Sequence, residues 1–101
     1  MNAPADDVRF DLALDGLESA VREFTRNRGL PLSVTTRKNV TRLTVADRIT
    51  VELGGIDRGL DAAYVAVTDP ATAMRMECRF PGFPTRAGLL GLLTGQLSEA
   101  D

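Results

Sequence analysis

The chain has 101 residues, of which 44% are apolar and 26% charged, and its formal net charge is −2. This composition excludes a disordered tail, which would be less apolar, and disfavours a generic nucleic-acid binder, which would be basic. The sequence contains no histidine and one cysteine, so it lacks the commonest general base and cannot form an intramolecular disulfide or a cysteine zinc cage. We expect one domain over residues 1–101, with residues 1–7 as a flexible tail.

The first predicted element is an amphipathic helix that ends at Gly29. Apolar residues recur at spacings of four, three, four and three and so share one helical face: Phe10, Leu14, Leu17, Val21 and Phe24. The start of the helix is open, because residues 8–14 also alternate as a strand would, and Asp15 to Glu18 matches a capping box that would start the helix at Gly16. We predict a helix over 16–28 and favour helix for 8–14. Gly29 terminates it, and Pro31 prevents its resumption.

Residues 32–80 are rich in β-branched residues, and apolar and polar residues alternate along several segments. We predict strands over 32–36, 40–45, 49–53, 63–68 and 73–80. The last two form the clearest hairpin, joined through the turn formers of residues 69–72. In the final strand the side chains that face one way are apolar and those between them are charged: Met74, Met76, Cys78 and Phe80 against Arg75, Glu77 and Arg79. Such alternation is typical of a sheet with one buried and one solvated face.

A closing helix completes the predicted order of elements. Residues 81–84 break the chain, Thr85 is a good N-cap, and residues 86–98 form the helix. The fold class is therefore α+β. We expect a two-layer sandwich in which an N-terminal and a C-terminal helix lie on one face of an antiparallel sheet of about five strands.

No motif in the sequence carries recognisable chemistry. The glycine-rich loop 54–59 lacks the Lys-Ser/Thr pair of a phosphate-binding loop. Asp57 and Asp61 lack the ladder of oxygen ligands that calcium requires. Cys78 lies on the apolar stripe of its strand with no histidine to activate it, so we expect a buried structural thiol. We predict no catalytic residue, no metal site and no cofactor.

Charge is unevenly distributed along the chain. Residues 1–21 hold five acids and one arginine (−4), residues 22–48 seven basic residues and two acids (+5), and residues 49–101 seven acids and four arginines (−3). Helix-end preferences explain the arginines before residue 29, but not four basic residues of the first strands and turns: Arg37, Lys38, Arg42 and Arg48. Hairpins bring such residues together, so we expect one patch that binds an acidic partner. The alternative is that they keep an edge strand from pairing.

The closing helix has a second unusual feature, a stripe of glycines opposite its leucine face. The stripe consists of Gly88, Gly91 and Gly95. Each glycine costs a helix about 1 kcal/mol relative to alanine, so three of them require a reason. Small residues permit close approach of a second helix, and we interpret the stripe as a candidate oligomer interface. The alternative is a weak helix at the end of the domain.

These observations lead to an expected function without catalysis. We expect a small protein-binding module of the adaptor, chaperone-like, immunity or inhibitor type. We expect its oligomeric state to be a homodimer. The alternative is a nucleic-acid-associated regulator that uses residues 37–48, which the acidic total and the lack of nearby aromatic residues disfavour. The N-terminus has neither the basic nor the apolar region of a secretory signal, and no apolar stretch approaches the roughly 20 residues of a membrane span. We therefore expect a cytoplasmic location and no membrane partner.

Overall fold

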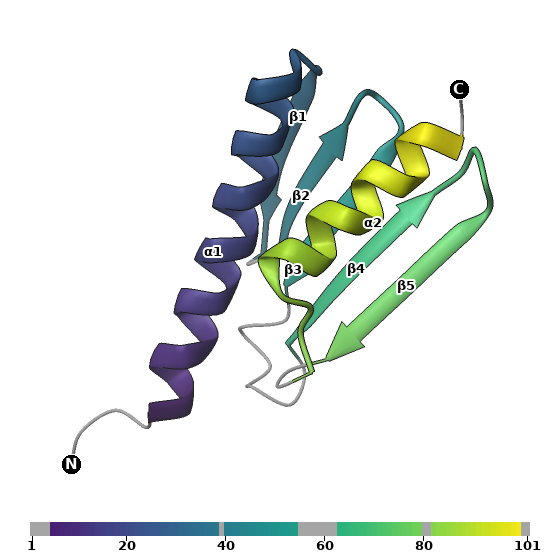
Figure 1. Ribbon diagram of the computed structural model, residues 1–101. Helices are drawn as coiled ribbons and strands as arrows, with labels where there is room; N and C mark the ends of the chain where they lie inside the picture. The colour runs from purple at the N-terminus through teal and green to yellow at the C-terminus, as the bar shows by residue number, and fades with distance from the viewer. Residues whose placement is uncertain (1–4, 39, 55–62, 80–81, 100–101) are drawn as a thin grey trace.

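In the computed structural model, one helix precedes five strands along the chain and a second helix follows them (Figure 1). The structure describes residues 5–38, 40–54, 63–79 and 82–99, with the backbone alone for 5–13 and 99. The elements are α1 (Ala5–Arg28), β1 (Leu32–Arg37), β2 (Val40–Val45), β3 (Ile49–Gly54), β4 (Tyr64–Asp69), β5 (Met74–Arg79) and α2 (Arg86–Glu99). The predicted α+β class is confirmed. The radius of gyration of 13.7 Å matches the roughly 13 Å of a compact domain of this length.

Helix α1 is continuous through residues 8–14, so the helical interpretation of that segment is confirmed. The helix starts at Ala5 rather than at Gly16, and Asp15 lies exposed in its interior instead of capping it. Burial explains the difference, because Leu14 belongs to the core and a helix that began at Gly16 would not place it there. The backbone of residues 5–7 is helical, and the expected flexibility of residues 1–7 stays a prediction.

A glycine-based cap ends α1, as the sequence predicts. Gly29 has a φ of +65°, its N–H donates to the Arg26 carbonyl at 3.3 Å, and the Leu30 N–H donates to the Thr25 carbonyl at 2.9 Å. This pair of hydrogen bonds is the Schellman pattern, which needs a residue that adopts positive φ without strain. The cap turns the chain out of the helix so that β1 begins at Leu32.

The five strands pair strictly in chain order, β1-β2-β3-β4-β5, and every neighbouring pair is antiparallel. Their register is unbroken by bulges, for example from Leu32 opposite Val45 to Arg37 opposite Val40. All five predicted strands are present, and their described ends differ from the prediction by at most one residue; Phe80 lies outside the described residues. Edge strands are therefore β1 and β5.

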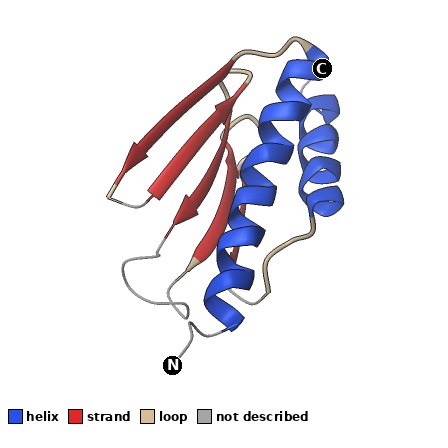
Figure 2. Cartoon of the chain, turned by 90° about the vertical axis from the view of Figure 1, so that its left-hand side faces the viewer, coloured by secondary structure: helices blue, strands red, loops and turns tan. Residues whose placement is uncertain are grey.

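Alternate positions of the three central strands are buried: Leu43, Val45, Ile49, Val51, Leu53, Val65 and Val67. Side chains of both helices belong to the same core cluster: Leu14, Leu17, Val21, Phe24, Leu89 and Leu93. In Figure 2 both helices lie on one side of the sheet. We call the opposite side, toward which the intervening strand positions point, the open face.

Helix α2 begins with the predicted threonine cap. The Gly88 N–H donates to Thr85 Oγ1 at 3.0 Å, which satisfies one of the free donors at the helix start. Leu89 and Leu93 are fully buried in the core. Among the described residues, no helix combines the length and apolarity needed to cross a membrane.

Candidate functional site

The open face carries a charge opposite in sign to that of the whole chain. The strand register places four arginines and two glutamates on it, a net charge of +2: Arg37, Arg42, Arg75 and Arg79 with Glu52 and Glu77. The remaining positions are mostly small or hydroxylated, including a row across four strands formed by Ser33, Thr44, Thr50 and Thr68. Because the whole chain carries −2, everything outside this face sums to −4. The open face is therefore a flat, polar surface with a local positive potential.

Two of the predicted basic residues lie together at one end of the sheet. Arg37 ends β1 and Lys38 occupies the turn to β2 with a φ of +51°, and both are exposed. Neither forms an ion pair with another described residue. Arg79 ends β5 at the same end of the sheet, since the register runs from Arg37 through Val40 and Tyr64 to Arg79. Arg79 nevertheless lies four strand spacings, roughly 19 Å, from Arg37 across the sheet, so we call Arg37 and Lys38 alone the basic end.

The other two predicted basic residues have carboxylate partners. Arg42 donates from Nη2 to Glu52 Oε2 at 2.7 Å across the open face. Arg48 lies in the β2–β3 turn, at the opposite end of β2 from Lys38, and a six-residue strand separates the two ends by roughly 20 Å. The structure therefore does not gather all four charges into one patch. Successive hairpin turns lie at opposite ends of an antiparallel sheet, which the spacing along the sequence does not reveal.

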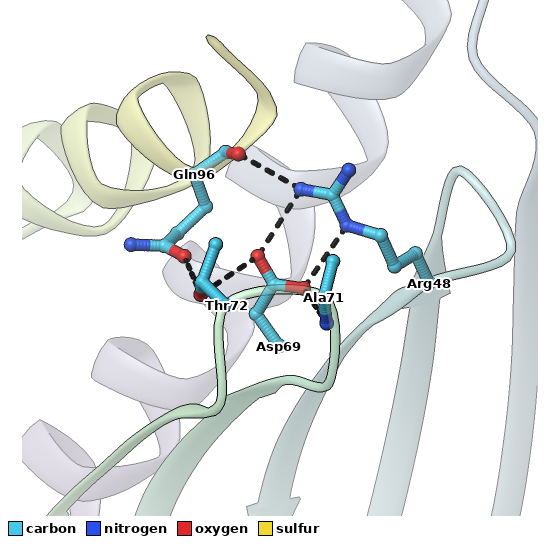
Figure 3. Close-up of polar contacts among 5 residues, drawn as sticks. All are labelled: Arg48, Asp69, Ala71, Thr72 and Gln96. Carbon is cyan, nitrogen blue, oxygen red and sulfur yellow. Dashed lines mark hydrogen bonds and ion pairs between the residues drawn. The ribbon is translucent and has the colours of Figure 1, made fainter. Parts of the chain in front are cut away.

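Arg48 belongs instead to a buried polar network that the sequence analysis missed (Figure 3). Its Nε and Nη2 donate to Asp69 Oδ1 and Oδ2 at 3.0 and 3.1 Å. Asp69 is fully buried, whereas the Arg48 side chain is 23% exposed. The Ala71 N–H donates to Asp69 Oδ1 at 3.0 Å, and the Thr72 hydroxyl lies 3.4 Å from Oδ2. Asp69 Oδ1 thus accepts from two N–H donors, whereas Oδ2 accepts from Arg48 Nη2, because the one hydroxyl proton of Thr72 takes part in a shorter bond to Gln96 Oε1.

Hydrogen bonds of the same network connect the last turn of α2 to two turns of the sheet. Arg48 Nη2 also donates to the Gln96 carbonyl at 2.8 Å, and the Thr72 hydroxyl donates to Gln96 Oε1 at 2.6 Å. Carbonyls in the last turn of a helix lack intrahelical donors, and a cation there is favourable. The network is therefore a structural tether between the β2–β3 turn, the β4–β5 turn and α2.

The glycine stripe of α2 lies on the solvent side of the helix. Gly88, Gly91 and Gly95 are all exposed. A Cβ added at Gly91 or Gly95 would meet no described atom within 4 Å, and one at Gly88 would meet the Thr85 hydroxyl at 3.1 Å. At Gly91 and Gly95 no part of the described chain requires a small side chain, whereas a Cβ at Gly88 would crowd the hydroxyl that caps α2. The proposed use of the stripe as an oligomer interface stays a prediction.

Cys78 is half-buried rather than fully buried. It faces the helix-covered side of the sheet with Met74 and Met76, as predicted, but it lies on an edge strand, which leaves one flank uncovered. Within the described residues no three His, Cys, Asp or Glu side chains converge as metal ligands would. The loop aspartates Asp57 and Asp61 lie outside the described residues.

Comparisons of the chain with protein-family models, with curated proteins and with solved structures gave no match. The functional argument therefore depends on the surfaces described above.

Proposed function

We propose that this chain is a small, non-catalytic binding module that recognises an acidic protein surface through its open face and basic end. The observation that carries the proposal is the charge separation: the sheet face that neither helix covers is net positive in a chain that is net negative. An adaptor, chaperone-like, immunity or inhibitor protein would use such a surface in the same physical way. Its place of action in this proposal is the cytoplasm.

Electrostatic steering explains why the basic end matters most. Arg37 and Lys38 are exposed, and no carboxylate of the described residues forms an ion pair with either of them, so their field reaches solvent. Arg42 has already formed an ion pair with Glu52. Exposed like charges accelerate encounter with an oppositely charged surface and disfavour wrong partners more than they add affinity.

The buried carboxylate supports a role without catalysis. A general base needs a free acceptor position for the proton that it removes. Both oxygens of Asp69 already accept from the Arg48 guanidinium, and Oδ1 also accepts from the Ala71 N–H. The most buried acid of the described chain is thus committed to holding α2 on the sheet.

Association kinetics test this proposal. Proteins that the wild-type chain captures from its native host are identified by mass spectrometry, and binding of each is measured by interferometry. Arg37→Glu combined with Lys38→Glu should slow association at least about tenfold at about 50 mM salt, and the difference should shrink at about 500 mM. Dissociation should change much less.

A matched control separates location from net charge. Arg26→Glu combined with Arg86→Glu makes the same change of charge on exposed helix positions, and it should leave the association rate within about threefold of wild type. Equal slowing by both pairs would refute a specific basic end. Tight binding of random-sequence duplex DNA that disappears by about 200 mM salt would support the nucleic-acid alternative instead.

A further inference from the structure

The outer edge of β5 is long, regular and open. Figure 1 shows β5 at the margin of the sheet, and neither helix lies beyond it. Its six residues pair one to one with β4, from Arg79 opposite Tyr64 to Met74 opposite Asp69, with no bulge and no proline. Natural edge strands are usually shortened, bulged or covered, because the free backbone groups can add another strand. The β5 edge is neither shortened, bulged nor covered in the described chain, and its charged residues alternate in sign, so they disfavour only those registers that oppose like charges.

The apolar side of β5 is incompletely covered. Met74, Met76 and Cys78 face the helix-covered side and are half-buried, whereas their partners on β4, Val65 and Val67, are fully buried. In Figure 1, α2 crosses the central strands and leaves β5 to one side. A further strand beside β5 would cover the free flank of these three side chains.

The charged side of β5 identifies the strand that fits best. Its residues alternate as Arg75, Glu77 and Arg79. Suppose that the β5 strands of two copies pair antiparallel, with Met76 of one copy opposite Met76 of the other. Arg75 of each copy then lies opposite Glu77 of the other, and Met74 lies opposite Cys78. Pairing about Arg75 or Glu77 would instead oppose like charges, which is unfavourable. The strand is thus self-complementary in both its apolar and its charged side chains.

We propose that two copies of this chain form a symmetric dimer by pairing their β5 strands antiparallel about Met76. The result is one continuous ten-stranded sheet with a two-fold axis perpendicular to it, and the interface is the same patch on both copies. Both open faces then point in the same direction, and both basic ends stay free. This dimer uses a surface different from the glycine stripe, and it does not depend on the proposed function.

Sedimentation velocity over a range of concentrations tests the pairing by charge exchange. Arg75→Glu places two carboxylates opposite each other at both symmetric positions and should raise the dimer dissociation constant at least about tenfold. The double variant Arg75→Glu/Glu77→Arg restores unlike pairs and should return the constant to within about threefold of wild type. Both variants lose the hydrogen bond from Arg75 to Thr68, so that loss cannot explain a difference between them. A wild-type chain that stays monomeric, or a dimer that Arg75→Glu does not weaken, overturns the proposal.

Disulfide trapping tests the register independently. Met76 lies opposite its own copy, so Met76→Cys in a Cys78→Ala background should give a cross-linked dimer under mild oxidation. The control Met74→Cys/Cys78→Ala places the two sulfurs four residues apart along the strands, roughly 13 Å, and should not cross-link. Efficient cross-linking through the native Cys78, with none at position 76, would contradict the Met76-centred register.

Discussion

Asp69 shows how a single buried charge can organise the end of a small fold. The carboxylate has no solvent exposure, and it is stabilised by the Arg48 guanidinium and the Ala71 N–H. Removing one partner of such a pair leaves an uncompensated charge in the interior, which usually costs more than the pair contributes. The energetic role of this network is therefore best measured by substituting each side separately and then both together.

We predict strong coupling between Arg48 and Asp69. Arg48→Met and Asp69→Asn should each lower the free energy of unfolding by about 2–4 kcal/mol, and the double variant should cost clearly less than their sum. Arg42→Met is the matched control, since its ion pair with Glu52 is exposed and should contribute less than about 1 kcal/mol. Urea denaturation measures all four changes. Equal costs for Arg48→Met and Arg42→Met would contradict the structural importance of the network.

The sequence near Asp69 predicts the turn contact of this network but not its long-range contacts. The Asp69-Pro70 pair is a recognisable turn signal, and the Ala71 N–H does donate to the Asp69 side chain as such turns require. The ion pair spans 21 residues, and the contact of Arg48 with Gln96 spans 48. Patterns within a few residues carry no information on contacts at that distance. Position along the chain therefore predicts that Arg48 lies near Arg37 and Lys38, whereas the fold places it at the opposite end of the sheet.

At the scale of elements, the two kinds of helix glycine should respond oppositely to alanine. Gly91 is exposed within α2, and an added Cβ meets nothing, so Gly91→Ala should raise the free energy of unfolding by about 0.5–1 kcal/mol. Gly29 holds a φ of +65°, so Gly29→Ala should lower it by about 1 kcal/mol. Thermal and urea denaturation of the two variants compare the signs directly. A Gly91→Ala chain that is destabilised, or that loses its oligomeric state, would favour the glycine stripe as an interface.

An element can be predicted from the sequence when the residues that determine it lie within its own segment. The strands and the two helix caps were identified because β-branched residues, Gly29 and Thr85 act within their own segments. The start of α1 was ambiguous because a capping box at Asp15 and an apolar repeat through Leu14 gave different answers. Packing decides between them: Leu14 and Leu17 are both buried against the sheet cluster, and tertiary burial outweighs a local cap.

At the scale of the molecule, the sequence predicts the number of layers but not the use of their surfaces. Alternation in the last strand correctly implies one covered and one solvated face. It does not show that β5 lies at the margin of the sheet, because strand order is a property of the whole fold. The proposed dimer and the proposed partner surface both depend on that order; they share the charged side chains of β5, whereas the basic end lies at the other edge strand, β1. The variants at Arg37 and Lys38 test the partner surface with the β5 interface intact.

The strictly sequential order of the strands has a consequence for the rate of folding. Every strand pairs with its neighbour in the chain, so the sheet can grow hairpin by hairpin, and such short-range contacts favour fast folding. Helix α2 makes the contacts that join the two ends of the chain, and we expect it to dock after the transition state. Leu93→Ala in α2 should therefore act mainly by accelerating unfolding, whereas Val51→Ala in the central strand β3 should mainly slow refolding. Stopped-flow chevrons of the two variants measure both rates, and slower refolding of Leu93→Ala would place α2 in the folding nucleus.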